Sequence, residues 1–103
     1  MEFDDGRYYA SRGETDQFYF YENRLSNLTK DDLKIEVQDK NIVFIDGLLD
    51  KTKYGFTRSI RVPPNGKVDE ARAVIRHGNL TITVPKAEGK VPEGNPRIIE
   101  IDT

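Results

Sequence analysis

Cysteine and tryptophan are both absent from this chain of 103 residues, and histidine and methionine occur once each. The lack of cysteine excludes disulfides, thiolate metal sites and thiol nucleophiles, and it suits a reducing cytoplasm. No stretch approaches the ~20 consecutive apolar residues that a membrane-spanning helix needs. The first 14 residues have neither the basic region nor the apolar region of a signal peptide. We therefore expect a cytoplasmic protein with no membrane partner.

The chain also has no large excess of basic or acidic residues. The 16 lysines and arginines face 18 aspartates and glutamates, which gives a formal net charge of −2 with the two signs interspersed. A nucleic-acid footprint needs clustered basic residues, so we expect no nucleic-acid partner. Hydrophobic residues make up 36% and charged residues 33% of the chain. This balance and length predict one domain with a thin core and a highly charged surface.

Reactive side chains are equally scarce. His77 stands beside Gly78 and is expected in a turn between two strands, while Asp31 and Asp32 are expected to hydrogen-bond the backbone ahead of a strand. The dinucleotide, P-loop, zinc-protease and serine-hydrolase motifs do not occur. We therefore expect a binding protein with no catalytic residues, no cofactor and no metal site.

No convincing helical periodicity occurs, and the apolar residues instead alternate with period two. This alternation is the pattern of half-buried strands. Clusters of glycine, proline, asparagine and aspartate separate the segments, as in Pro63–Gly66. The expected strands are residues 17–25, 33–37, 41–46, 54–62, 71–76 and 80–84. Such short strands predict an all-β fold, an antiparallel two-sheet β-sandwich.

The two ends of the chain differ from this middle part. Residues 1–16 show no sustained periodicity, and we expect a short, mostly flexible N-terminal arm. Residues 17–85 would form the domain, and residues 86–103 a C-terminal linker and tail. The linker is rich in proline and glycine, which disfavours regular structure.

One stretch is specific enough to suggest a family. AVIRHGNLTITVPK, which begins at Ala73, resembles the A-x-x-x-n-G-v-L signature followed by T-v-x-v-P-K of the α-crystallin domain of small heat-shock proteins. Ala73, Gly78 and Leu80 occupy the three signature positions, whereas His77 and Asn79 replace the usual asparagine and valine. The resemblance implies an immunoglobulin-like sandwich that binds partly unfolded proteins without ATP.

Upstream segments resemble the same family in the same order. FTRSIRVP is similar to F-x-R-x-F-R-L-P, which places Arg58 at the arginine that the family has near its dimer interface. RLSNLTKDDLKIEV and NIVFIDG resemble two further strands of the family. The resemblance implies a dimer and possible higher homo-oligomers. The connection over residues 48–53 is short for a strand that swaps into a partner, so the dimer geometry stays open.

The tail carries Ile99-Glu100-Ile101, which matches the family's I-x-I/V motif. In an extended segment Ile99 and Ile101 point the same way and Glu100 points to water. The resemblance implies that this anchor docks into a groove of a neighbouring domain. By match, the groove is lined by residues of two strands, some of which must face the core instead: Leu33, Ile35, Val37, Leu80, Ile82 and Val84. The alternative is a last strand of the same domain, or a tail docked in its own groove.

The resemblance implies an ATP-independent chaperone, a holdase that binds partly unfolded client proteins and prevents their aggregation. The short N-terminal arm predicts weaker activity or a smaller oligomer than is typical of the family. The alternative function is a non-chaperone adaptor or structural assembly module on the same fold, such as a CS-domain-like co-chaperone.

Overall fold

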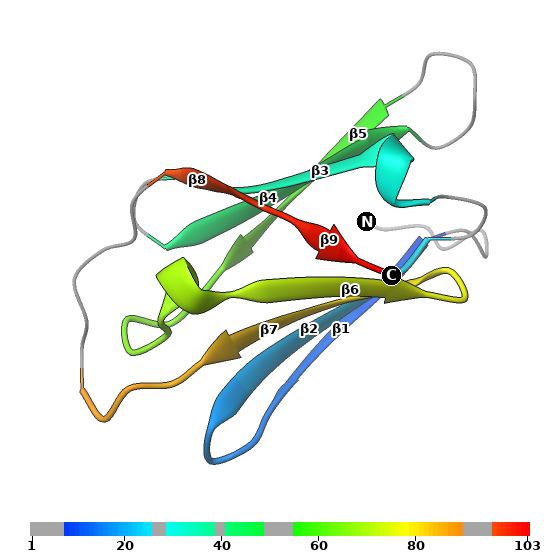
Figure 1. The fold of residues 1–103 in the computed structure, drawn as a ribbon. Helices are drawn as coiled ribbons and strands as arrows, with labels where there is room; N and C mark the ends of the chain where they lie inside the picture. Colours follow the sequence, from blue (N-terminus) through cyan, green and yellow to red (C-terminus); the bar gives the residue numbers. More distant parts are fainter. Residues whose placement is uncertain (1–7, 26–28, 39–40, 49–54, 90–95) are drawn as a thin grey trace.

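Two β-sheets pack face to face in the computed structural model, which describes residues 8–25, 29–38, 41–48, 55–89 and 96–103 (Figure 1). The Cα radius of gyration is 13.5 Å. The strands of the described residues are β1 (Tyr8–Glu14), β2 (Phe18–Leu25), β3 (Leu33–Gln38), β4 (Ile42–Leu48), β5 (Gly55–Arg61), β6 (Arg72–Arg76), β7 (Asn79–Pro85), β8 (Arg97–Ile99) and β9 (Ile101–Asp102). The expected all-β sandwich is confirmed, and each expected strand segment overlaps one observed strand.

One sheet has five strands in the order β1-β2-β7-β6-β9, and the other has four in the order β5-β4-β3-β8. All pairings are antiparallel except the parallel one between β6 and β9. The last two strands belong to different sheets. The C-terminal tail therefore joins the edge of one sheet to the edge of the other.

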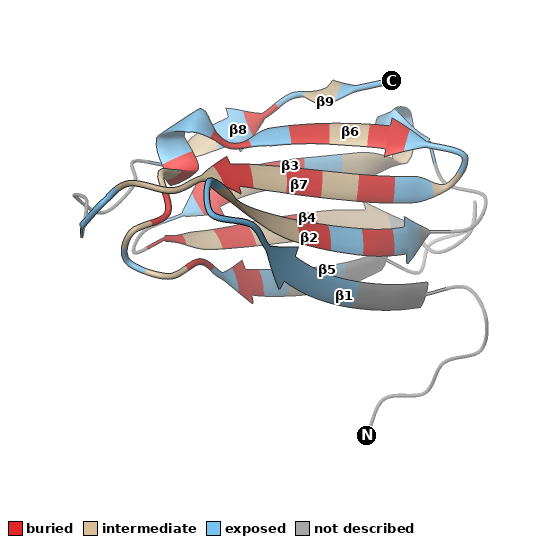
Figure 2. Ribbon diagram, turned by 90° about the horizontal axis from the view of Figure 1, so that it is seen from below, coloured by how far each residue is buried: buried red, intermediate tan, exposed pale blue. Residues whose placement is uncertain are grey.

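Alternation along the strands builds the core. Figure 2 shows buried positions alternating with intermediate ones along β6 and β7. Ile35, Leu80, Ile82 and Val84 are fully buried between the sheets, while polar residues at the intervening positions face outward. Because successive side chains of a strand point to opposite faces, one apolar face per sheet is enough for this core.

The β6–β7 hairpin explains two residues of the signature. His77 and Gly78 form its two-residue loop between the paired residues Arg76 and Asn79, and their φ angles are 51° and 80°. Positive φ at both central positions defines a type I′ turn, which fits the right-handed twist of the flanking strands. His77 is exposed in this turn, as expected. A residue with a Cβ pays a conformational cost there that glycine at the second position avoids.

Two short 3₁₀ turns complete the regular structure of the described residues: η1 (Lys30–Asp32) and η2 (Val68–Glu70). The Thr29 backbone N–H donates to Asp32 Oδ2 at 3.1 Å, so Asp32 caps the turn ahead of β3 as the sequence predicted. Within the described part of the chain, the structure contains no helix long and apolar enough to cross a membrane.

Residues 1–7 of the expected flexible arm lie outside the described residues, but the following seven residues of that arm form a strand. Tyr8–Glu14 forms β1, which pairs with β2 along its full length from Tyr8↔Leu25 to Glu14↔Tyr19. Apolar residues do not alternate along this segment, because the positions of β1 that pair with Tyr21 and Tyr19 of β2 carry Arg12 and Glu14. The backbone ladder to β2 supplies the hydrogen bonds that order this segment.

Candidate functional site

The candidate site is formed by the edges of β3 and β6, which the C-terminal tail covers through β8 and β9. Without the tail, β3 is the outer strand of one sheet and β6 the outer strand of the other. Unpaired strand edges present rows of backbone donors and acceptors that another extended chain can pair with. In Figure 1 the tail, drawn in red, runs from β3 across to β6 and covers this side of the sandwich. We call this surface the tail groove.

The two isoleucines of the motif enter the tail groove to different depths. Ile99 pairs with Ile35 of β3 and is only 2% exposed, as part of the core cluster. Ile101 pairs with Ala73 of β6 and is half-buried against the same cluster. Glu100 between them is exposed, and Ile98 is 61% exposed. The period-two geometry of an extended tail therefore selects Ile99 and Ile101 as the inward-facing pair.

Arg97 adds polar contacts at the start of the tail. Its guanidinium Nη2 donates to the Ala71 backbone oxygen at 2.9 Å and to the Val68 backbone oxygen at 3.2 Å. Both carbonyls belong to the short segment around η2, directly before β6. A guanidinium donates several hydrogen bonds in a fixed plane, so one side chain satisfies both carbonyls. Arg97 thus links β8, on one sheet, to the chain entering the other sheet.

The structure places the predicted groove residues in two different environments. Leu33, Ile35 and Val37 lie on β3, next to the tail, although Ile35 and Val37 also face the core. Leu80, Ile82 and Val84 lie on β7, which is an interior strand between β2 and β6. Their side chains are fully buried in the core, and β6 lies between β7 and the tail strand β9.

The second wall of the tail groove is β6, with Ala73 and Ile75 as its buried residues. Sequence reasoning named Ala73 only as a signature residue and did not select Arg97. The alternation of Ala73 and Ile75 was visible, but it could not reveal which strand lies at the sheet edge. Strand order depends on pairings between distant segments, which local periodicity does not encode.

The tail occupies the groove of its own domain. The expectation was an anchor for a neighbouring domain, and docking in its own groove was the alternative. The connection includes residues 90–95, which lie outside the described residues. In the structure the tail and its groove belong to one chain, and this arrangement buries Ile99 without a partner.

Arg58 lies on β5, the other edge strand of the four-stranded sheet, and its side chain is half-buried. β5 is the partner of β4 in a consecutive antiparallel pair, from Ile42↔Arg61 to Leu48↔Gly55. Most of the short connection over residues 48–53 lies outside the described residues. The free edge of β5 is therefore on the side of the sandwich away from the tail groove, where β1 is also an edge.

Metal-binding geometry is not evident in the described parts of the chain. They contain no group of three or more histidine, aspartate or glutamate side chains placed to hold an ion. The chemistry that the tail groove offers is backbone pairing and apolar burial.

A sequence model of the Hsp20/alpha crystallin family matches residues 12–102, which include both sheets and the tail. The chain belongs to the Hsp20/alpha crystallin family. Among curated family members, the 16.9 kDa class I heat shock protein 3 of Oryza sativa subsp. japonica is 35% identical over 94 residues, covering 78% of this chain. The 18.1 kDa class I heat shock protein of Arabidopsis thaliana is 32% identical over 103 residues, covering 86% of this chain. The matches cover 63% and 62% of these two relatives.

Solved structures of small heat-shock proteins share the fold. A small heat-shock protein from Xylella fastidiosa has a TM-score of 0.68 at 22% identity, over 82% of this chain and 90% of that one. Heat shock protein 16.0 from Schizosaccharomyces pombe has a TM-score of 0.70 at 20% identity, over 84% and 72% of the two chains. The Hsp20/alpha crystallin fold expected from the signature residues is therefore confirmed.

Proposed function

We propose that this protein is an ATP-independent chaperone of the cytoplasm that binds partly unfolded proteins and prevents their aggregation. The observation that carries the proposal is the tail groove, in which two sheet edges are covered by a short segment with a single fully buried side chain, Ile99. Membership of the Hsp20/alpha crystallin family agrees with it, as do the heat shock names of the relatives.

The groove suits an extended apolar segment of a client. A client strand that replaced the tail would pair with the backbone edge of β3 or β6 and place alternate side chains against Ile35, Val37 and Ala73. Strand addition takes its affinity from main-chain hydrogen bonds, which do not depend on sequence. The groove would therefore bind many different clients, because it requires only two apolar side chains at the right spacing.

Energy magnitudes favour reversible docking of the tail. Burial of one isoleucine side chain contributes about 1.5 to 3 kcal/mol, and ordering the backbone costs about 1 to 2 kcal/mol per residue. The tail buries Ile99 fully and Ile101 in part. Its net docking energy is therefore small, and a client segment present at sufficient concentration competes with it. Binding and release in this scheme require no nucleotide.

We also propose that the same exchange links subunits. A tail that leaves its own groove could enter the groove of a second chain, where it would form the same strand pairings and the same Arg97 hydrogen bonds. Edge pairing of β5 near Arg58 is the proposed dimer contact. These two contacts together would hold a homo-oligomer, and neither contact requires a chemical reaction.

Thermal aggregation of a heat-labile enzyme tests the chaperone function. We expect light scattering of the heated client to fall when this protein is added without ATP, and to fall further with an Ile99→Ala, Ile101→Ala variant, whose groove is free. Ile98→Ala is the matched control, because it shortens an exposed isoleucine of the same tail. Unchanged client aggregation at a several-fold molar excess of both proteins would contradict the proposal. Capture of one folded partner and no denatured client would instead favour the adaptor alternative.

A further inference from the structure

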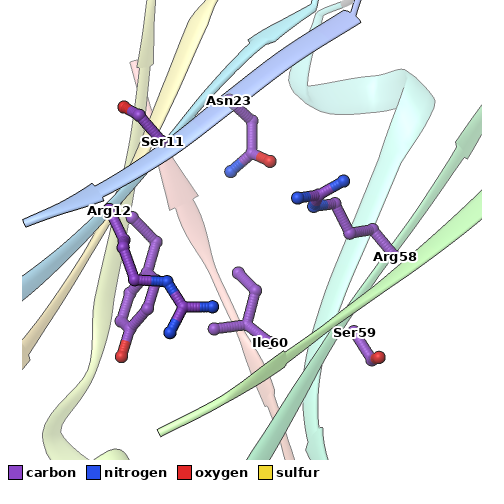
Figure 3. A pocket seen from close by; sticks show the side chains of 7 residues that line it. Ser11, Arg12, Asn23, Arg58, Ser59 and Ile60 are labelled. Atoms are coloured by element: carbon purple, nitrogen blue, oxygen red, sulfur yellow. The ribbon is translucent and has the colours of Figure 1, made fainter. Parts of the chain in front are cut away.

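A second cavity lies on the opposite side of the sandwich from the tail groove, between β1 and β2 of one sheet and β5 of the other. Its volume is about 210 Å³, and it is lined by Ser11, Arg12, Tyr21, Asn23, Arg58, Ser59 and Ile60. In Figure 3 the Arg12 and Arg58 side chains extend from opposite sheets toward the space below the Asn23 amide. The described residues that line the cavity include two guanidinium groups and no acidic group.

Asn23 is the most informative residue of this cavity. It is 2% exposed, and neither its amide nitrogen nor its amide oxygen has a hydrogen-bond partner. It pairs with Leu80 of β7, so it occupies a core-facing position where an apolar residue would be expected. A buried polar group without a partner is strongly unfavourable, and such groups are rare in folded proteins. A ligand that pairs with this amide would remove the penalty.

Arg12 is held over the cavity by a neighbour on β2. It pairs with Tyr21 across β1 and β2, and its guanidinium carbon lies 5.9 Å from the centroid of the Tyr21 ring. A cation over an aromatic face is attracted to the ring, which limits the directions that the side chain explores. Arg12 and Arg58 therefore bring two positively charged side chains to the same cavity, one from each sheet.

We propose that this cavity is a binding site for a small phosphate group. Arg12 and Arg58 would bind the anionic oxygens of the phosphate, and the Asn23 amide would form a hydrogen bond with the phosphate hydroxyl. Guanidinium groups match the oxygens of phosphate in paired hydrogen bonds. The amide of Asn23 has two donor hydrogens and one acceptor oxygen. The ligand must therefore offer acceptors and at least one donor. Phosphate near neutral pH retains an O–H, whereas sulfate does not. The bound group would also tie β1 to β5 across the open side of the sandwich.

Thermal unfolding at constant ionic strength tests this site, with inorganic phosphate as the probe and sulfate and chloride as comparison anions. Ligand that binds only the folded state raises its stability with the logarithm of ligand concentration. We expect the melting temperature to rise by about 5 °C or more at ten times the dissociation constant. Sulfate should give a clearly smaller rise. Isothermal titration calorimetry should show one phosphate per chain. A compact phosphate monoester, tested in parallel, distinguishes a free ion from a phosphorylated small molecule as the preferred source.

Variants separate this effect from the general stabilisation that phosphate salts give to folded proteins. Arg12→Gln and Arg58→Gln should each lose the specific rise, while Arg72→Gln, an exposed arginine on β6, should keep it. Asn23→Leu should melt no lower than wild type without phosphate and should not respond to it. An equal phosphate response in wild type, Arg12→Gln and Arg58→Gln would overturn the proposal. A wild-type melting temperature that responds no more to phosphate than to sulfate at the same ionic strength would also overturn it.

Discussion

Neighbouring isoleucines of the tail have opposite environments, which makes them a matched pair at the residue scale. Ile99 is 2% exposed and Ile98 is 61% exposed. We expect Ile99→Ala to lower the free energy of unfolding by about 2 kcal/mol, the low end for a buried isoleucine. The cost is limited because the shortened tail can leave the groove while the sandwich stays folded. Ile98→Ala should change the free energy of unfolding by less than about 0.5 kcal/mol. Chemical denaturation checks both values, and equal effects would contradict the assigned orientation.

Arg97 makes the second residue-scale prediction. Arg97→Met keeps the aliphatic length of the side chain and removes both hydrogen bonds to the Val68 and Ala71 carbonyls. Hydrogen bonds that involve a charged group contribute about 1.5 to 3 kcal/mol each, so tail docking should weaken markedly. Hydrogen exchange of the β8 amides should accelerate while that of the β7 amides stays unchanged. Arg72→Met, at an exposed position of β6, is the control. Acceleration throughout both sheets would mean that Arg97 stabilises the whole domain and not the tail alone.

At the element scale, β1 is attached by an ion pair as well as by its ladder to β2. Lys86 Nζ lies 2.7 Å from Glu14 Oε2 and 4.7 Å from the centroid of the Tyr19 ring. The hydrogen bond that Lys86 Nζ donates to the Glu14 carboxylate raises the pKa of Lys86 above its ordinary value of 10.5. Burial raises the pKa of Tyr21, on the adjacent strand, above its ordinary value of 10.0, although Arg12 acts in the opposite direction. Both groups hold their protons more tightly in the folded state.

This proton binding predicts a loss of stability in alkaline solution. Above about pH 10 the unfolded chain releases these two protons before the folded chain does, so the native state binds more protons and its stability falls as pH rises. Below that pH the contribution is complete. We expect the melting temperature to drop as the pH rises above about 10, and the drop to be smaller in Tyr21→Phe and in Glu14→Gln. Glu22→Gln, at an exposed position of β2, should follow wild type. Identical alkaline profiles in all four proteins would contradict the assignment.

At the scale of the whole molecule, the tail groove decides between a closed single domain and a linked assembly. Size-exclusion chromatography with light scattering should show a smaller species for the Ile99→Ala, Ile101→Ala variant than for wild type and Ile98→Ala. The physical reason is that the tail can bridge two chains only if its two isoleucines fill the second groove. A variant that elutes as wild type and melts much lower would show that the tail only completes its own sandwich. The proposed assembly would then be wrong.

The alternation of apolar residues was sufficient to predict the strands of the sandwich, because period two is a local property that a strand buried on one face imposes. The family signature and the turn at His77 and Gly78 were also readable, since a two-residue hairpin loop has its own conformational demands. The orientation of Ile99, Glu100 and Ile101 followed from extended geometry alone. These features could be predicted because each depends only on residues that are close together in the sequence.

Tertiary structure decided the rest, because pairings between distant segments set it. β6, not β7, borders the tail groove, and only the strand order reveals this. β1 has no apolar alternation, so its order comes from the backbone ladder to β2. Arg97 and Asn23 acquire their roles only when η2, β1 and β5 are brought beside them. The sequence by itself determined the central strands of the sandwich and the alternation along them, because both are local properties, whereas pairings between distant segments determined the strand order, the formation of β1 and which strand edges can bind another chain.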